Sequence, residues 1–125
     1  MHEASLAQGL LNLVISSLED YNKKNAAKPA IQVKEIICGA GLLAGFEDNT
    51  LRACFEMFAE GTACEKANLK INFIPLDCVC QRCGKSFQLE RKHFICPFCG
   101  CEQIDFNGGS GLILQAINVD NEEES

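Results

Sequence analysis

Hydrophobic side chains recur every three or four positions through the first two dozen residues. This spacing places them on one face of an α-helix. Polar residues fill the positions between them, and charged residues end the segment. We therefore expect an amphipathic helix over residues 3–24. Its apolar face comprises Leu6, Leu10, Leu13, Val14 and Leu18.

The pattern changes to that of β-strands in three later segments. Residues 30–39 are rich in β-branched side chains, which favour strands. Residues 67–75 alternate between apolar and polar side chains, as a half-buried strand does. Residues 112–119, "LILQAINV", resemble a last strand. The apolar positions behind the first two predictions are Ile31, Val33, Ile36, Ile37, Leu69, Ile71 and Phe73.

A second helix is predicted for residues 47–62, "EDNTLRACFEMFAEGT". Asp48 or Asn49 is suited to cap its first turn, and Gly61 is suited to end it. The carboxylates Glu47 and Asp48 are better explained by capping than by catalysis. Four side chains fall on one helical face and predict its buried side. They are Leu51, Cys54, Phe55 and Phe58.

The order of these elements indicates an α/β (α+β) fold. We expect a small three-stranded sheet with two helices on one face, plus an inserted zinc-ribbon module. Glycine-rich residues 39–45 are expected to form a turn, and residues 108–111 a return hinge. The α/β domain then comprises residues 1–75 and 108–120, the module residues 76–107, and an acidic tail residues 121–125.

Composition narrows the classes of function. The 125-residue chain has a net charge of −6, which argues against general binding to nucleic acids or anionic membranes. No run approaches the ~20 apolar residues of a membrane span, and Glu3 stands where a secretion signal carries positive charge. Without an export signal, nine cysteines indicate metal ligands in a reducing cytoplasm rather than disulfides.

The strongest chemical signal is a pair of C-x-x-C motifs separated by twelve residues. Each motif directs two thiolates to one point, and a glycine follows each of them. Four thiolates complete the tetrahedral shell of Zn²⁺ and leave no open position for a catalytic water, so the site is expected to be structural. The expected ligands are Cys80, Cys83, Cys96 and Cys99.

Other interpretations of these cysteines remain open at this point. Cys78 and Cys101 lie two positions outside the motifs and offer alternative ligands, although C-x-C spacing gives poorer chelate geometry. A redox dithiol is a weaker alternative, because the thioredoxin-like context is missing. The remaining three cysteines resemble small core residues. They are Cys38, Cys54 and Cys64.

The cysteine-rich segment also raises a nucleic-acid alternative. Residues 78–101 carry four basic residues against one acidic residue, whereas the rest of the chain carries seven against sixteen. A zinc-ribbon nucleic-acid or transcription accessory protein is therefore the runner-up, although the acidic remainder speaks against it. A surface for an acidic protein partner is the better interpretation of the basic residues.

The second residue is one of only two histidines. A free α-amine, the His2 amide nitrogen and the His2 Nδ1 can form adjacent chelate rings around one metal ion. Nitrogen coordination of this kind suits Ni²⁺ or Cu²⁺ better than Zn²⁺. Glu3, or His93, could complete the coordination sphere. No nucleophile–base arrangement is visible, so we do not expect an enzyme.

Three features together resemble a known family. "MHE" heads an amphipathic helix, "FEMFAEGTACEKANLKI" follows, and "CVCQRC" precedes "CPFCG". In this order they resemble the HypA family of hydrogenase nickel-incorporation metallochaperones. The resemblance implies Ni²⁺ as cargo at Met1, His2 and Glu3, and structural Zn²⁺ at the four motif cysteines.

The resemblance also implies the partners. They are a HypB-type GTPase and the large subunit of [NiFe]-hydrogenase, with urease maturation as a secondary role in some members. No nucleic-acid or membrane partner is implied, and a homodimer is one option for the assembly.

Overall fold

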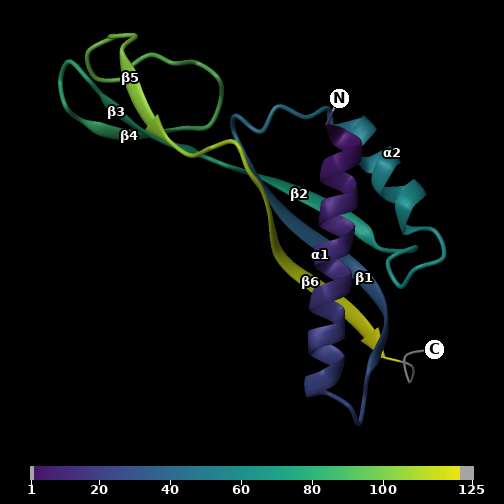
Figure 1. Ribbon diagram of the computed structural model, residues 1–125. Helices are drawn as coiled ribbons and strands as arrows, with labels where there is room; N and C mark the ends of the chain where they lie inside the picture. The colour runs from purple at the N-terminus through teal and green to yellow at the C-terminus, as the bar shows by residue number, and fades with distance from the viewer. Residues whose placement is uncertain (1, 122–125) are drawn as a thin grey trace. The chain divides into compact units, whose positions relative to one another are not determined.

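The computed structural model describes residues 2–121. Its helices and strands alternate at first and end in four strands (Figure 1). One sheet has the strand order β2-β1-β6 and the other β4-β3-β5. The bounds are α1 (Glu3–Lys24), β1 (Ala30–Gly41), α2 (Asp48–Ala59), β2 (Asn68–Ile74), β3 (Leu76–Cys80), β4 (Ser86–Leu89), β5 (Ile104–Asn107) and β6 (Leu112–Asn121).

The helix predicted for residues 3–24 is confirmed as α1. Its buried face differs at two positions, because Leu6 is only half-buried and Leu13 is 50% exposed. With about 100° between successive residues, Leu13 falls well outside the stripe that the buried residues share. Ala7 and Leu11 take part in their place. The buried apolar residues of α1 are Ala7, Leu10, Leu11, Val14 and Leu18.

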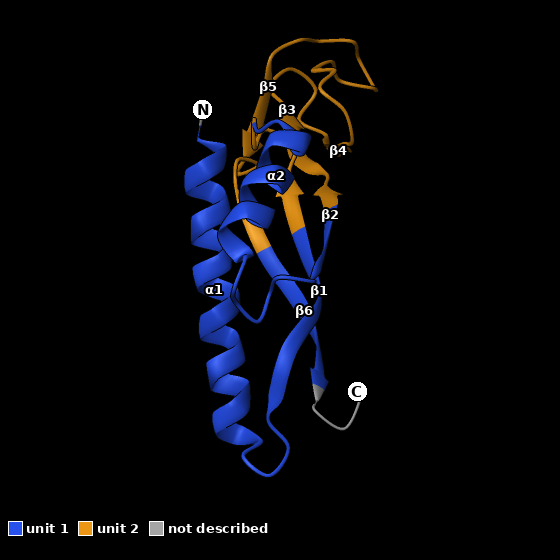
Figure 2. Ribbon diagram, turned by 90° about the vertical axis from the view of Figure 1, so that its right-hand side faces the viewer, with its two compact units in different colours: residues 1–38, 46–71, 114–125 blue, residues 39–45, 72–113 orange. Residues whose placement is uncertain are grey.

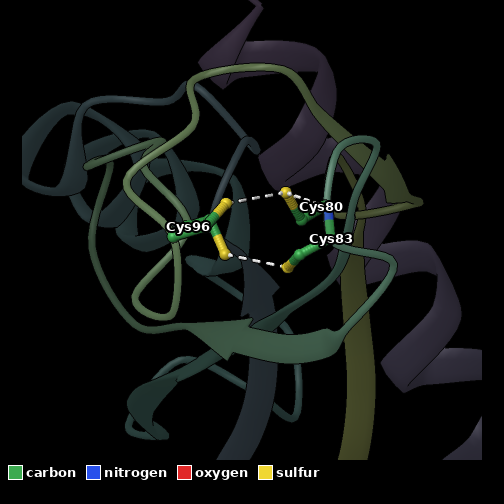
Figure 3. Close-up of side chains that lie close together, drawn as sticks. Cys80, Cys83 and Cys96 are labelled. Carbon is green, nitrogen blue, oxygen red and sulfur yellow. Dashed lines mark hydrogen bonds between the residues drawn. The ribbon is translucent and has the colours of Figure 1, made fainter.

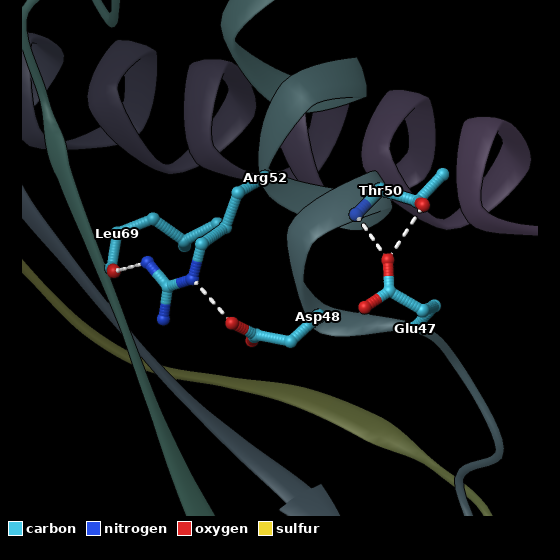
Figure 4. Close-up of polar contacts among 5 residues, drawn as sticks. All are labelled: Glu47, Asp48, Thr50, Arg52 and Leu69. Atoms are coloured by element: carbon cyan, nitrogen blue, oxygen red, sulfur yellow. Dashed lines mark hydrogen bonds and ion pairs between the residues drawn. The ribbon is translucent and has the colours of Figure 1, made fainter.

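Helix α2 packs against α1, and its first turn differs from the prediction. The capping residue is Glu47, one of the two carboxylates assigned to capping, rather than Asp48 or Asn49. A Glu47 carboxylate oxygen, Oε1, accepts hydrogen bonds from the Thr50 backbone N–H at 2.8 Å and the Thr50 hydroxyl at 2.6 Å (Figure 4). The longer glutamate side chain reaches the third helical N–H, as shorter caps usually do.

The buried face of α2 consists of Leu51, Phe55 and Ala59, whereas Cys54 and Phe58 are half-buried. One arginine joins this helix to the sheet. Arg52 donates from Nε to Asp48 at 2.9 Å and from a terminal nitrogen to the backbone carbonyl of Leu69 in β2 (Figure 4). Arg52 thereby connects α2 to β2.

The predicted strands are present, with shifted limits and faces. Strand β1 continues through Gly41, so the turn expected over residues 39–45 begins later, where the Ala44 N–H donates to the Gly41 carbonyl. Ile31 and Phe73, which the pattern placed inside, are 56% and 67% exposed. Cys38 and Cys64 are buried, as expected of small core residues.

The expected fold class is confirmed: both helices cover one face of the β2-β1-β6 sheet (Figures 1 and 2). The chain divides into two compact units, one of residues 1–38, 46–71 and 114–125, and one of residues 39–45 and 72–113 (Figure 2). The domain boundaries proposed from the sequence stay a prediction. Within residues 2–121, no helix combines the length and apolar character needed to cross a bilayer.

The second unit has a sheet of its own, which the hydrophobic pattern did not predict. Strand β3 pairs antiparallel with both β4 and β5. Its alternating burial, with Leu76, Cys78 and Cys80 inside, gives it one covered and one exposed face. Strands of four or five residues with cysteine at buried positions carry too weak an apolar alternation to stand out from the sequence.

Two glycine-rich segments meet inside the same unit. The Gly41 N–H donates to the Gly111 carbonyl at 2.9 Å, and the Leu43 N–H donates to the Gly109 carbonyl at 2.7 Å. A Cβ atom on Gly41 would lie closer than 3.0 Å to three backbone atoms of Gly109. We call this pairing of residues 41–43 with residues 109–111 the glycine contact.

Candidate metal centres

The four motif cysteines come together at the end of the second sheet. Cys80 ends β3, Cys83 follows in the next turn, and Cys96 and Cys99 come from the loop between β4 and β5. The four sulfur atoms lie within 4.8 Å of one another, with Cys80–Cys99 at 3.6 Å and Cys83–Cys96 at 3.7 Å (Figure 3). A tetrahedron with Zn–S bonds of ~2.3 Å has sulfurs about 3.8 Å apart. The donor set therefore fits zinc.

The two C-x-x-C turns have matching backbone hydrogen bonds. The Gly84 N–H donates to the Cys80 carbonyl at 2.9 Å, and the Gly100 N–H donates to the Cys96 carbonyl at 2.9 Å. Both glycines have positive φ angles, 75° and 78°. An added Cβ would meet open space at either position, so the backbone angle is what favours glycine there.

Backbone amides also point at the sulfur atoms. The N–H groups of Arg82 and Cys83 each lie 3.4 Å from the Cys80 Sγ, and the Phe98 N–H lies 3.4 Å from the Cys96 Sγ. Hydrogen bonding, led by the Cys83 N–H, lowers the pKa of the Cys80 thiol to about 6. Thiolates bind metal and thiols do not, so these N–H groups favour the metal-binding form of Cys80.

The neighbouring cysteines lie outside this group. Cys78 is buried on β3, where its Sγ lies 3.5 Å from the Leu76 carbonyl oxygen. The Cys101 Sγ accepts the Gln103 N–H at 3.3 Å. Among residues 2–121, the four motif cysteines are the one group of three or more cysteine, histidine or carboxylate side chains close enough to share a metal ion.

The predicted nickel ligands lie at the start of α1. Met1 is outside the described residues. His2 is exposed and immediately precedes the helix, with its carbonyl accepting the Leu6 N–H at 2.9 Å. Its imidazole makes no capping hydrogen bond to the helix. The His2 amide precedes the first turn and is not needed for a helical hydrogen bond.

Glu3, unlike His2, is buried. Its Oε2 accepts the backbone N–H of Glu47 at 2.8 Å, which ties the start of α1 to the residue that caps α2. The N-terminal ammonium group, together with this Glu47 hydrogen bond, lowers the pKa of the Glu3 carboxyl to about 2. The sequence analysis assigned Glu47 to capping but missed its contact with Glu3, because nothing in the sequence links residues 44 positions apart.

The second histidine is exposed in the loop after β4, in the other compact unit. The His93 backbone N–H donates to the Arg91 carbonyl, and the His93 carbonyl accepts the Ile95 N–H. Within the unit that holds it, His93 is no part of the four-cysteine group.

Comparison with known proteins gives consistent results. Residues 1–119 match the family described as "Hydrogenase/urease nickel incorporation, metallochaperone, hypA". The hydrogenase maturation factor HypA of Aquifex aeolicus is 34% identical over 96% of this chain and 98% of its own length. The HypA of Syntrophus aciditrophicus is 32% identical over 96% of this chain and all of its own length.

Among solved structures, the solution structure of the Ni metallochaperone HypA from Helicobacter pylori has a similar fold. It aligns with a TM-score of 0.59 at 22% identity, over 95% of this chain and 97% of that one. At this level of identity, the likeness supports the fold alone.

Proposed function

The chain belongs to the HypA family of hydrogenase/urease nickel-incorporation metallochaperones, and on this premise we propose that Met1, His2 and Glu3 hold its Ni²⁺ cargo for delivery during [NiFe]-hydrogenase maturation. Membership places the chain among metal carriers rather than enzymes. A carrier needs a site that both captures a metal ion and gives it up.

The exposure of His2 ahead of the first helical turn is the observation that carries this proposal. Its imidazole and its amide nitrogen are not committed to the hydrogen bonds of α1. Together with the α-amine they offer nitrogen donors of the kind that Ni²⁺ accepts in tetragonal geometry. An exposed site of this kind can load and unload by stepwise ligand exchange.

Glu3 has a different part from His2 in this proposal. Its Oε2 is engaged with the Glu47 N–H, so the side chain anchors the start of α1 while its amide nitrogen or carboxylate adds a ligand. The buried anchor limits the freedom of the exposed residue beside it. Fewer conformations of His2 then have to be given up on binding the metal.

We propose Zn²⁺ as the resident of the four-cysteine group. The ion supplies the cross-link that this small unit needs, since the strands of its β4-β3-β5 sheet are short and its buried apolar residues are few. Zn²⁺ with four thiolates also adds two negative charges. The net charge of residues 78–101 then falls from +3 to about +1, which weakens the nucleic-acid alternative further.

The proposed partners follow from the same family. They are a HypB-type GTPase, as the other nickel-handling protein, and the large subunit of [NiFe]-hydrogenase, as the acceptor. The reducing cytoplasm is the proposed compartment, because the four thiolates must stay unoxidised. Pull-down of the tagless chain with each purified candidate would test these partners one at a time.

The test of the cargo site is a nickel titration of the zinc-loaded protein with its native N-terminus, followed by optical absorption and by metal analysis. We expect one Ni²⁺ per chain in the parent. His2→Ala should lose it while keeping zinc. His93→Ala is the matched control, because it removes the only other imidazole, and it should bind nickel as the parent does.

A second variant tests the α-amine. A Gly-Ser extension ahead of Met1 converts the amine to an amide and should weaken nickel capture as His2→Ala does. Equal nickel uptake by the parent, His2→Ala and the extended chain would refute the proposed site. Loss of nickel in His93→Ala would move the site toward the second unit.

A further inference from the structure

The sheet of the second unit has one face that is open. Residues opposite one another in an antiparallel pair point to the same side, and neighbours along a strand point to opposite sides. The pairings of β3 with β4 and β5 therefore place six side chains on one face, and all six residues are exposed. This open face comprises Asp77, Val79, Ser86, Gln88, Asp105 and Asn107.

The other face packs against the loop that carries the second cysteine motif, and we call it the covered face because Leu76, Cys78 and Cys80 are buried there. Phe87 of β4 meets Phe98 of this loop with ring centroids 6.5 Å apart, and Phe106 of β5 meets Phe94 at 6.3 Å. Lys85 lies 4.7 Å from the centre of the Phe98 ring on this side. Aromatic packing and positive charge are thus gathered on the covered face.

The open face is negative and hollowed. The six side chains border most of a cavity of about 570 Å³. Two of them are carboxylates, and neither Asp77 nor Asp105 forms an ion pair among residues 2–121. Glutamine amides hold both in place, with Gln88 donating to Asp77 at 2.8 Å and Gln81 donating to Asp105 at 2.6 Å.

We propose that this open face is a docking surface for an extended, basic segment of a partner protein. The chemistry it selects is two lysine or arginine residues separated by one residue. Its two carboxylates are fixed in position and lack cations of their own. Val79, 42% exposed and directly opposite Asp105, offers an apolar floor.

The spacing of the carboxylates sets the spacing of the partner's cations. Asp77 faces Asn107 and Asp105 faces Val79, so the two aspartates lie on a diagonal of the sheet. Diagonal neighbours are about 7–8 Å apart. Side chains two residues apart on an extended strand project to one side with a separation of about 7 Å. Their aliphatic stems would cross Val79 while the charged ends reach the carboxylates.

Other occupants fit this surface less well. A nucleic acid would place phosphates against two carboxylates. A second copy of this chain would need a basic segment with the same spacing, and the sequence has none, since its adjacent basic pairs, Lys23-Lys24 and Arg91-Lys92, project to opposite sides when extended. The docking surface is also independent of the proposed nickel site, so the two can be tested separately.

The experiment uses the full-length, zinc-loaded chain at low salt, where exposed charges are least screened. Two capped peptides of one composition are titrated, Thr-Lys-Thr-Lys-Thr and Thr-Lys-Lys-Thr-Thr, while backbone amide shifts are followed by NMR. We expect the first peptide to bind more tightly, with the largest shifts in β3, β4 and β5. The His2→Ala variant should bind it as the parent does.

Isosteric variants test the role of charge. Asp77→Asn and Asp105→Asn keep an oxygen that can accept from the glutamine amides, so the fold should survive, as unchanged zinc content would show. Each should lower the affinity for the spaced peptide by up to about fivefold, the range of an exposed ion pair. Glu102→Gln removes one charge from an exposed residue outside the cavity and is the matched control.

Each of the following outcomes would overturn the proposal. They are no shifts at millimolar peptide, equal binding of the two peptides, unchanged affinity in the double variant Asp77→Asn/Asp105→Asn, and a self-association of the chain that buries the open face. Shifts confined to the other unit would overturn it as well.

Discussion

Replacing Gly41 by alanine should destabilise the second unit far more than replacing Gly111, although both belong to the glycine contact. Gly41 has an ordinary backbone angle, so alanine is conformationally acceptable there. The obstacle is its neighbour, because the new Cβ would lie closer than 3.0 Å to three backbone atoms of Gly109. Backbone cannot rotate away as a side chain can.

The magnitude follows from what must give way. Forcing a methyl group into a filled space costs about 1–3 kcal/mol. Separating the two segments also weakens the hydrogen bonds from the Gly41 and Leu43 N–H groups, each contributing about 1 kcal/mol. A loss of about 3 kcal/mol is therefore expected for Gly41→Ala. With a urea dependence of about 2 kcal/mol per molar, the unfolding midpoint should fall by roughly 1.5 M.

The assay is urea unfolding of the zinc-loaded protein, followed by circular dichroism and by hydrogen exchange. Gly111→Ala is the matched control, because its Cβ would meet nothing within 4 Å and its φ is not positive. That variant should stay within about 1 kcal/mol of the parent. Faster exchange of the Leu43 N–H in Gly41→Ala would show that the glycine contact itself has opened. Equal midpoints for Gly41→Ala and Gly111→Ala would refute the reasoning.

Three further outcomes are expected. Arg52→Ala should lower the free energy of unfolding, measured by thermal unfolding, by about 1–2 kcal/mol, since it removes a charged donor to the Leu69 carbonyl. Arg52→Lys should restore part of the lost stability. Equal stability of the parent and the two variants would contradict this. Cys96→Ser should release zinc and unfold the second unit, whereas Cys101→Ser should keep the zinc and the folded unit. Metal analysis and near-ultraviolet circular dichroism can show this. The Lys70 ammonium lowers the pKa of the Glu35 carboxyl below its usual 4.5. The Glu35 carboxylate therefore stabilises the fold above pH 4.5, and this stabilisation is lost as the pH falls through the lowered pKa. Glu35→Gln should flatten the acid limb of a curve of stability against pH.

Much of the fold could be predicted because its periodic patterns are long. Helix α1 has six turns of regular spacing, and the prediction matched both of its ends. The predicted buried face of α2 was correct at Leu51 and Phe55. Its cap was narrowed to three consecutive polar residues, and the choice among them depends on reach rather than on residue type.

The candidate sites show where sequence reasoning stops. The four-cysteine group was predictable because each half is a local turn, and only the meeting of the halves is tertiary. The link from Glu3 to Glu47 and the glycine contact were not, because each is a pairing of distant backbone positions that leaves no periodic signal. One glycine-rich segment was predicted to be a turn and the other a return hinge, but their close approach to each other depends on the folded sheet.

The four-cysteine group has a solvent side and a protein side, and this sets its chemical durability. Each C-x-x-C turn contributes one buried sulfur residue, Cys80 or Cys96, and one exposed residue, Cys83 or Cys99. Oxidants and chelators therefore reach one edge of the tetrahedron, the Cys83–Cys99 edge, from outside, and the remaining thiolates lose their protection once a ligand there is modified. The lifetime of a metal ion held here would be set by kinetics at the two exposed sulfurs, while its equilibrium affinity would be set by all four.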